Sequence, residues 1–297
     1  MRVRGGTPKY GGTPKYGGTP KYAVTEPAAG VFFVEGPASN WIILRSGDAF
    51  TLIDGGYPGD LPLVLDSIRD TGLDPADAAA VLVTHAHVDH AGTAGYFAAA
   101  YGHPVLCSAP EHPYVLGQDR EQVSAAQILG RIWQPSVLHW TWHVLVAGGA
   151  GRVAVPTAAP WNDDELAALP GSPVAVPTPG HTPGHTAFYL PAAHAVATGD
   201  ALVTGHALSR HRGPQMLDSM FHSDDDGARR SLGQLGKLDA SLLLPGHGPA
   251  VRVGVRQAVG TVRSRAAVRK RRLVAPGAIP GFAEPTYGRY VPDNTDG

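Results

Sequence analysis

The sequence predicts an α/β fold, and three observations lead to this class. Short runs rich in β-branched and aromatic residues, separated by Gly, Pro, Asn and Asp, open the patterned part of the chain. Segments with helical spacing then alternate with buried-strand patterns. Several predicted strands are flanked by polar, ionisable residues. A chain of 297 residues, with 43% hydrophobic and 16% charged residues, can bury a core of the size that such a fold needs.

The first half of the pattern begins with strands and then alternates helix and strand. Its helix over 60–72 carries apolar residues at Leu61, Val64, Leu65 and Ile68 and is closed by Gly72. In chain order, the predicted elements are antiparallel strands over 31–36, 40–46 and 49–56, the helix over 60–72, a buried strand over 79–85 and a helix over 91–102.

The second half is predicted to supply further strands over 172–178, 186–191 and 195–199, a helix over 226–238 and a last strand over 240–246. The section 111–161 between the halves is less regular and holds four tryptophans, at positions 133, 140, 142 and 161. We expect it to form a helical insertion over the functional site.

The sequence divides into a tail, a folded domain and a basic end. The hexapeptide GGTPKY occurs three times over 5–22, and its Gly, Pro and Lys offer too little apolar surface to offset the entropy of ordering. We therefore predict a disordered tail over 1–22 and a folded domain over 23–255. Residues 256–297 are predicted to form a basic helix and tail.

Composition excludes several classes of protein. The net charge of −1 gives no general attraction to nucleic acid or anionic lipid, so we expect a small-molecule substrate. The single Cys107 rules out an internal disulfide framework and fits a reducing compartment. No apolar run approaches the roughly 18 residues of a membrane span, and the start of the chain does not resemble a signal peptide. We expect a cytoplasmic protein.

A cluster of histidines stands out directly after the buried strand over 79–85. The stretch THAHVDHAG, residues 84–92, places His85, His87, Asp89 and His90 within six positions. Imidazole nitrogens and carboxylate oxygens are ligands that zinc prefers. Because side chains alternate along the chain, His85 and His87 are expected to face one metal position, and Asp89 and His90 can face a second one. The cluster is predicted to bind metal, and it needs further ligands from elsewhere.

Three such ligands are available at His181, Asp200 and His247. Each lies beside a Gly at a predicted strand end, where the backbone can turn sharply and present a side chain at the same edge of the fold. The isolated His103, His112, His194 and His206 are expected to be surface or capping residues instead.

This pattern resembles the metallo-β-lactamase-fold hydrolases, whose HxHxDH signature is matched by residues 85–90, with GHT, TGD and PGHG following in the family's order from about Val31 to about Val251. The resemblance implies a four-layer αβ/βα sandwich of two mixed β-sheets, with helices on the outer faces and a dinuclear metal site. By position, it implies that one metal is held by His85, His87 and His181, and the other by Asp89, His90 and His247, with Asp200 bridging them. It also implies that His185 and Asp54 orient ligands without binding metal.

The chemistry implied by the resemblance is hydrolysis. A water between two divalent ions, most often zinc with iron or manganese as alternatives, loses a proton near neutral pH and attacks an ester, thioester or lactone carbonyl. Asp89 would be a ligand that can also exchange a proton.

The sequence departs from the motifs of several individual branches of this family, which narrows the range of expected substrates. Zinc β-lactamases of the best-known class carry Cys where this chain has Asp200, and another main class lacks a bridging Asp, which argues against antibiotic hydrolysis. Glyoxalase II shares the full ligand pattern, but residues 201–212 lack its glutathione-binding Lys and Tyr. Quorum-quenching lactonases place Tyr where this chain has Val203. The glyoxalase II and lactonase-like branch remains the best match in ligand pattern.

Three alternatives stay open. The basic run after position 255 is similar to that of β-lactamase-like ribonucleases, which cleave phosphodiesters, although we do not expect nucleic acid as the partner because the net charge is −1. Persulfide dioxygenases use one iron at the positions of His85, His181 and Asp200. A binding module without catalysis is the third class.

Overall fold

The computed structural model describes residues 22–119 and 135–274. The predicted tail, apart from Tyr22, lies outside the described residues, as do residues 120–134 of the predicted insertion and the end of the chain beyond 274. Tyr22 does not belong to the tail in which the sequence places it. Its side chain is buried, and its hydroxyl donates a hydrogen bond to the Asp70 carboxylate at 2.7 Å.

The first sheet has seven strands in sequential order, antiparallel from β1 to β4 and parallel from β4 to β7. The strand β3 is buried at five consecutive residues, as expected for a strand covered on both faces. The strands are β1 (Ala23–Ala28), β2 (Val31–Glu35), β3 (Asn40–Ser46), β4 (Ala49–Ile53), β5 (Ala78–Leu82), β6 (Val105–Cys107) and β7 (Ala159–Pro160).

The second sheet has five strands in the order β12-β11-β10-β9-β8, and only the β10–β11 pair is parallel. Both sheets are therefore mixed. The strands are β8 (Val174–Pro177), β9 (Thr186–Leu190), β10 (Ala195–Gly199), β11 (Leu242–Pro245) and β12 (Val251–Arg252).

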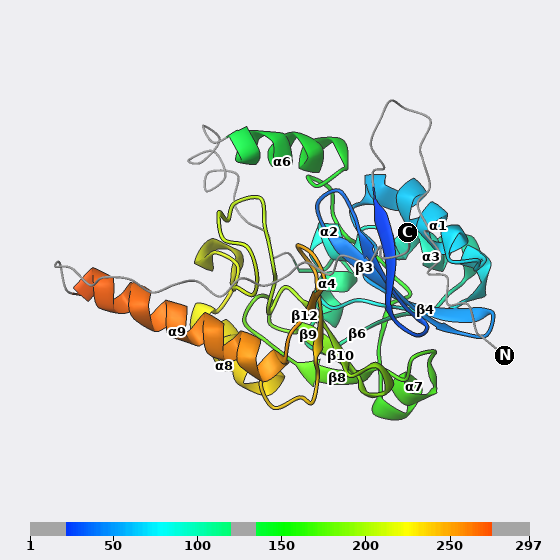
Figure 1. Cartoon of the computed structure of the whole chain (residues 1–297). Helices are drawn as coiled ribbons and strands as arrows, with labels where there is room; N and C mark the ends of the chain where they lie inside the picture. Colours follow the sequence, from blue (N-terminus) through cyan, green and yellow to red (C-terminus); the bar gives the residue numbers. More distant parts are fainter. Residues whose placement is uncertain (1–21, 120–134, 275–297) are drawn as a thin grey trace, which may run out of the picture.

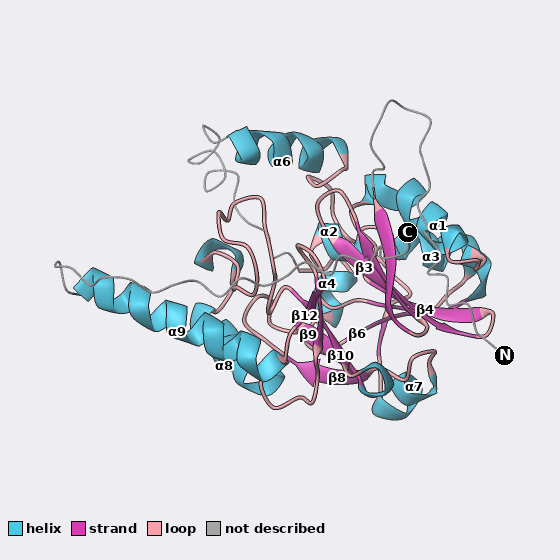
Figure 2. Cartoon of the chain, in the orientation of Figure 1, coloured by secondary structure: helices cyan, strands magenta, loops and turns pink. Residues whose placement is uncertain are grey.

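Helices cover the outer faces of both sheets (Figures 1 and 2). The first sheet carries α1 (Leu61–Asp70) and α3 (Ala94–Tyr101), and the second carries α8 (Asp225–Leu235) and α9 (Val255–Val274). The remaining helices are α2 (Val88–Ala91), α4 (His112–Val115), α6 (Pro135–Val146) and α7 (Asp163–Ala168), with 3-10 turns at Pro58–Asp60, Pro75–Asp77, Pro191–Ala193 and Ser219–Phe221.

Three buried clusters separate the four layers. Phe97 of α3 and Ile68 of α1 pack against the outer face of the first sheet. Between the sheets, Leu82 of β5 and Phe188 of β9 belong to one cluster. On the far side, Val259 of α9 packs against the second sheet. The predicted four-layer αβ/βα sandwich is confirmed.

The sequence pattern missed the short and edge strands β1, β6, β7 and β12. The strand β7 has two residues, one of them Pro160, and β6 has three, so neither produces a readable alternation. The strand β1 carries Pro27 and lies at the edge of its sheet, which is where proline is tolerated.

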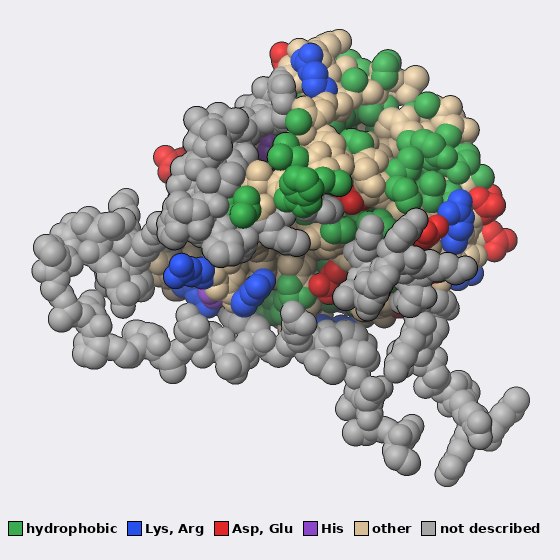
Figure 3. Space-filling model, turned by 90° about the horizontal axis from the view of Figure 1, so that it is seen from above, with side chains coloured by type: hydrophobic (Ala, Val, Ile, Leu, Met, Phe, Trp, Pro, Cys, Tyr) green, Lys and Arg blue, Asp and Glu red, His purple; other side chains and the backbone are tan. Residues whose placement is uncertain are grey.

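The described part of the predicted insertion includes α4 and α6. The segment that follows α6 packs Ala147 against Tyr57 and Val88, the latter within the histidine motif. The helix α6 exposes four large apolar side chains, those of Leu138, Trp142, Leu145 and Val146. Figure 3, which views the molecule from above, shows hydrophobic side chains on the face that carries α6. Within the described ranges, no helix is both long and apolar enough to cross a membrane.

Candidate metal centre

The histidine motif lies where β5 ends and α2 begins. After Leu82 the chain leaves the sheet, passes through His85 and His87 as a loop, and enters α2, which carries Asp89 and His90. The two pairs therefore come from two local structures, a loop and a helical turn, and not from one alternating strand. The helical turn places the His90 ring 4.2 Å from that of His85 and brings Asp89 into a group with His90 and His247.

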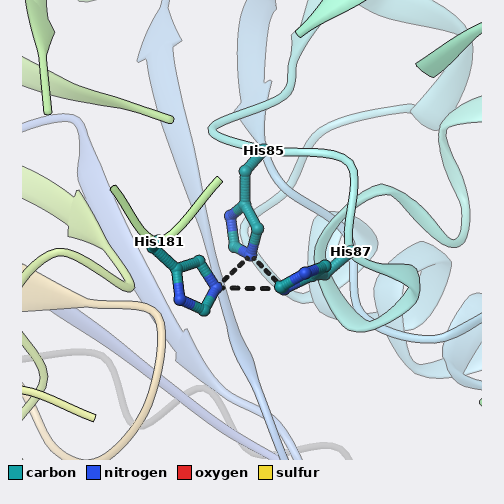
Figure 4. A group of neighbouring side chains, drawn as sticks. All are labelled: His85, His87 and His181. Carbon is teal, nitrogen blue, oxygen red and sulfur yellow. Dashed lines mark hydrogen bonds between the residues drawn. The ribbon is translucent and has the colours of Figure 1, made fainter. Parts of the chain in front are cut away.

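Three histidines from two distant loops face one another (Figure 4). His181 Nε2 lies 3.1 Å from His85 Nε2 and 3.0 Å from His87 Nδ1, and His85 Nε2 lies 3.1 Å from His87 Nδ1. Three nitrogens bound to a tetrahedral zinc at about 2.0–2.1 Å would be about 3.3 Å apart. The spacing of these three nitrogens is close to that value.

A second group combines the helical turn with the loop after β11. His247 Nε2 lies 3.4 Å from Asp89 Oδ2, and His90 Nε2 lies 3.7 Å from the same oxygen. Asp200 lies between the two groups, because its Oδ2 is 3.3 Å from His181 Nε2 and also 3.3 Å from His247 Nε2. The structure thus brings together all the predicted ligands as sets that could hold metal: His85, His87, His181; His85, His90, Asp200; and Asp89, His90, His247.

Buried polar atoms without hydrogen-bond partners support a fit to metal. His90 Nε2 and Asp200 Oδ1 are both buried, face each other at 3.4 Å and make no hydrogen bond to any other described residue. Such atoms cost free energy unless something satisfies them. Gly246 has no room for a side chain here, since a Cβ would lie 2.4 Å from Asp200 Oδ1. The donor set and its orphaned atoms both suit a divalent cation.

The Asp54 side chain holds the histidine motif in place through hydrogen bonds to Thr84 and His90. It has a positive φ of 59°, which is uncommon for a residue other than glycine. Its carboxylate accepts hydrogen bonds from the Thr84 backbone N–H at 2.9 Å and from the Thr84 hydroxyl at 2.8 Å, and it contacts His90 Nδ1 at 2.9 Å. This contact directs His90 Nε2 into the site, which is the orientation expected of a residue that positions a ligand.

His185 is turned away from the three-nitrogen group. Its Nε2 accepts the backbone N–H of Asp200 at 3.0 Å, and its Nδ1 contacts the Thr178 hydroxyl at 2.8 Å. Both ring nitrogens are therefore engaged by protein groups, so His185 supports Asp200 while His181 faces the other histidines.

The two sides of the site differ in electrostatics. Burial holds the pKa of His85 and of His181 well below its ordinary value, helped by the neighbouring imidazoles, so both rings are neutral and have lone pairs to give. On the other side, burial opposes charge on His247, but the carboxylates of Asp200 and Asp89 outweigh burial and raise its pKa to about 10.

The carboxylates stay ionised although they are buried. Burial alone would raise the pKa of Asp89, but His90 and His247 outweigh it and lower that pKa to about 2. His247 and His90 likewise keep the pKa of Asp200 well below its ordinary value against burial. These negative groups attract positive charge to this side of the site, as a proton or as a metal ion.

Several residues around the site were not identified from the sequence. His206, expected to be a surface or capping residue, has its ring 5.1 Å from that of His247, and the ring of His222 lies 5.6 Å from that of His181. Glu111 and Asn40 are buried and hold the loops that carry the ligands. No local motif marks these residues, because each acts through contacts distant in sequence.

The fold, the site geometry and the sequence match agree on a class of protein. The family model described as "Metallo-beta-lactamase superfamily" matches residues 34–247, which include strands of both sheets and all the residues of the two groups. The chain belongs to this superfamily of metallo-hydrolases.

Its relatives are distant in sequence. The "Probable metallo-hydrolase YflN" of Bacillus subtilis is 24% identical over 232 residues, covering 76% of this chain and 82% of the relative. A hydroxyacylglutathione hydrolase of Enterobacter is 25% identical over 150 residues, covering 50% of this chain and 41% of the relative. Among solved structures, a metallo-beta-lactamase family protein of Thermus thermophilus superposes with a TM-score of 0.57 at 22% identity, covering 83% of this chain and 82% of that one, which shows the shared fold.

Proposed function

We propose that the protein is a dinuclear metal hydrolase that cleaves an ester, thioester or lactone bond of a small molecule. The observation that carries the proposal is the placement of Asp200, whose Oδ2 is equally close to a nitrogen of each group. A carboxylate between two cations reduces their mutual repulsion. Zinc is the metal that the three-nitrogen group suits best, with iron or manganese as alternatives.

When bound, two such ions supply an activated water and polarise the scissile carbonyl. The chain's own residues prepare this chemistry. His85 and His181 are held neutral by burial, and Asp54 turns His90 Nε2 into the site. Asp89 Oδ2 lies 3.4 Å from His247 Nε2, and the low pKa of this carboxyl keeps it ionised as a ligand of the second group. No side-chain nucleophile is needed.

We propose that the substrate is a carbonyl compound and not a phosphodiester. The hydroxyacylglutathione hydrolase among the relatives supports thioesters, although that match covers less than half of the relative. The segment 201–212 has no Lys or Tyr with which to hold glutathione, and presents His206 beside His247 instead. We therefore propose a thioester, ester or lactone whose leaving group is not glutathione, handled in the cytoplasm.

Use of one iron is the runner-up. An enzyme that needs only His85, His181 and Asp200 would leave Asp89 and His247 without a role. Here these two lie 3.4 Å apart and belong to a complete third set of ligand atoms, which favours two ions.

A substrate panel tests the proposal. Purified protein of known metal content would be assayed on thioesters, lactones, phosphodiesters and β-lactams. We expect about two metal ions per chain and turnover confined to the thioesters and lactones. Turnover of phosphodiesters alone, or one iron with oxygen consumption, would replace the proposal with one of the alternatives.

A further inference from the structure

We propose that Glu111 is a positioning residue that holds together the two loops of the three-histidine group. The inference rests on the proposed metal centre and concerns a residue outside its ligand set. Glu111 precedes α4 and is fully buried, which is uncommon for a carboxylate unless it is paired or hydrogen-bonded.

Each oxygen of the Glu111 carboxylate binds a different loop. Oε1 accepts the backbone N–H of Ala86 at 2.8 Å. Oε2 accepts the hydroxyl of Thr182 at 2.8 Å and the backbone N–H of Gly184 at 2.9 Å. One side chain therefore spans both segments from which the three histidines come.

The contacts are adjacent to the ligands in sequence. Ala86 lies between His85 and His87, and Thr182 directly follows His181. A shift of either contact would move a ligand nitrogen, and the nitrogens now lie 3.0–3.1 Å apart. Groups that orient metal ligands typically change metal affinity by about 10 to 100-fold when removed.

Packing shows that the spacing between Glu111 and the His181 loop is tight. A Cβ at Gly184 would lie 2.3 Å from the Glu111 backbone nitrogen, so only glycine allows this approach. The Ser108 hydroxyl also donates to the Gly184 carbonyl at 2.6 Å. The start of α4 is thus fixed against the loop, and the carboxylate adds the link to the histidine motif.

The second group has a matching residue. Asn40 Nδ2 donates to the carbonyls of Pro245 at 2.9 Å and Gly248 at 2.7 Å, on either side of His247. Asn40 therefore serves as a matched control, because it holds a ligand loop of the other group in the same manner.

The test measures zinc affinity by competition with a chromophoric chelator in two backgrounds. His247→Ala leaves the three-histidine group, and His181→Ala leaves the group of Asp89, His90 and His247. Glu111→Gln keeps the volume but replaces one acceptor with a donor. We expect it to weaken zinc binding about 10 to 100-fold in the His247→Ala background and less than about 3-fold in the His181→Ala background. Asn40→Asp should show the reverse pattern.

Equal losses in both backgrounds would show that Glu111 acts only through general stability and would overturn the inference. So would unchanged affinity in the His247→Ala background. If Glu111→Gln does not fold, Thr182→Val removes one donor to the same carboxylate and should weaken zinc binding in the same background. Wild-type protein that binds no zinc would refute the proposed metal centre itself, whereas two tight zinc ions with an unaffected Glu111→Gln would refute the Glu111 role alone.

Discussion

His185 Nε2 accepts the backbone N–H of Asp200 at 3.0 Å. Since Nε2 is an acceptor, the ring proton must be on Nδ1, which donates to the Thr178 hydroxyl at 2.8 Å. Burial lowers the pKa of His185 to about 3, in agreement with a neutral ring. His185 thus fixes the backbone from which the Asp200 carboxylate projects between the two groups.

The first prediction separates His181 from His185, which lie in the same GHTPGH stretch. His181→Ala removes a nitrogen that faces two others, so turnover should be abolished and bound zinc should fall, leaving only the ion of Asp89, His90 and His247. His185→Ala removes only a support of Asp200 and should lower zinc affinity or activity by about 10 to 100-fold, with partial recovery in added zinc. Metal analysis and initial rates on both variants check this.

The control for this pair is His185→Gln, whose side-chain oxygen can still accept the Asp200 N–H. It should retain more activity than His185→Ala. If His185→Ala loses metal and turnover while His181→Ala keeps both ions, the assignment of these two histidines is inverted.

The second prediction concerns acid stability. The pKa of His185 is about 3 in the folded protein and about 6.5 when the chain is unfolded, so the unfolded state binds the extra proton between these values. Its contribution to stability is therefore present above pH 6.5 and is lost as the pH falls toward 3. In chelator-treated protein, the free energy of unfolding of wild type should fall more steeply from pH 6.5 to 4 than that of His185→Gln. Parallel curves would contradict a buried neutral His185.

The third prediction concerns Asp200. Asp200→Ala removes the carboxylate that lies 3.3 Å from both His181 Nε2 and His247 Nε2. Without it, two cations would repel each other with less compensation, so one metal ion and most turnover should be lost. Elemental analysis of dialysed protein measures the loss. Two retained ions with full activity would exclude a bridging role.

The fourth prediction concerns Cys107, which is fully buried on β6. Burial, with a smaller contribution from the Glu111 carboxylate, raises the pKa of its thiol to about 12. The thiolate is the reactive form, so the native protein should resist iodoacetamide at pH 8 and react only after unfolding. Mass spectrometry of the labelled protein gives the result, and rapid modification without unfolding would be inconsistent with this burial.

The sequence predicts an α/β fold because its long elements carry clear patterns, and the resemblance to the metallo-β-lactamase-fold hydrolases implies the four-layer sandwich. The runs that become β2, β3 and β4 are buried almost throughout, and α1 shows its apolar face at Val64 and Ile68. The ligand-type residues are also visible, since four of them lie within six positions and the others lie beside glycines at strand ends.

The supports of the site could not be predicted from local sequence. Glu111 lies 71 and 73 positions from Thr182 and Gly184, and Asn40 lies 205 from Pro245, so only the folded chain brings these partners together. A buried carboxylate and a surface one have the same sequence signature. His206 is likewise predicted to be a surface or capping residue, and its Nδ1 does accept the Leu208 N–H at 3.2 Å, but nothing near it in sequence indicates its contact with His247.

Anomalous X-ray scattering from crystals of zinc-loaded protein, measured on both sides of the zinc edge, is the most direct test of the metal centre. The account predicts two peaks, one within about 2.3 Å of His85 Nε2, His87 Nδ1 and His181 Nε2, and one beside Asp89, His90 and His247, with Asp200 contacting both. A single peak, or peaks away from these residues, would contradict a dinuclear site built from this ligand set.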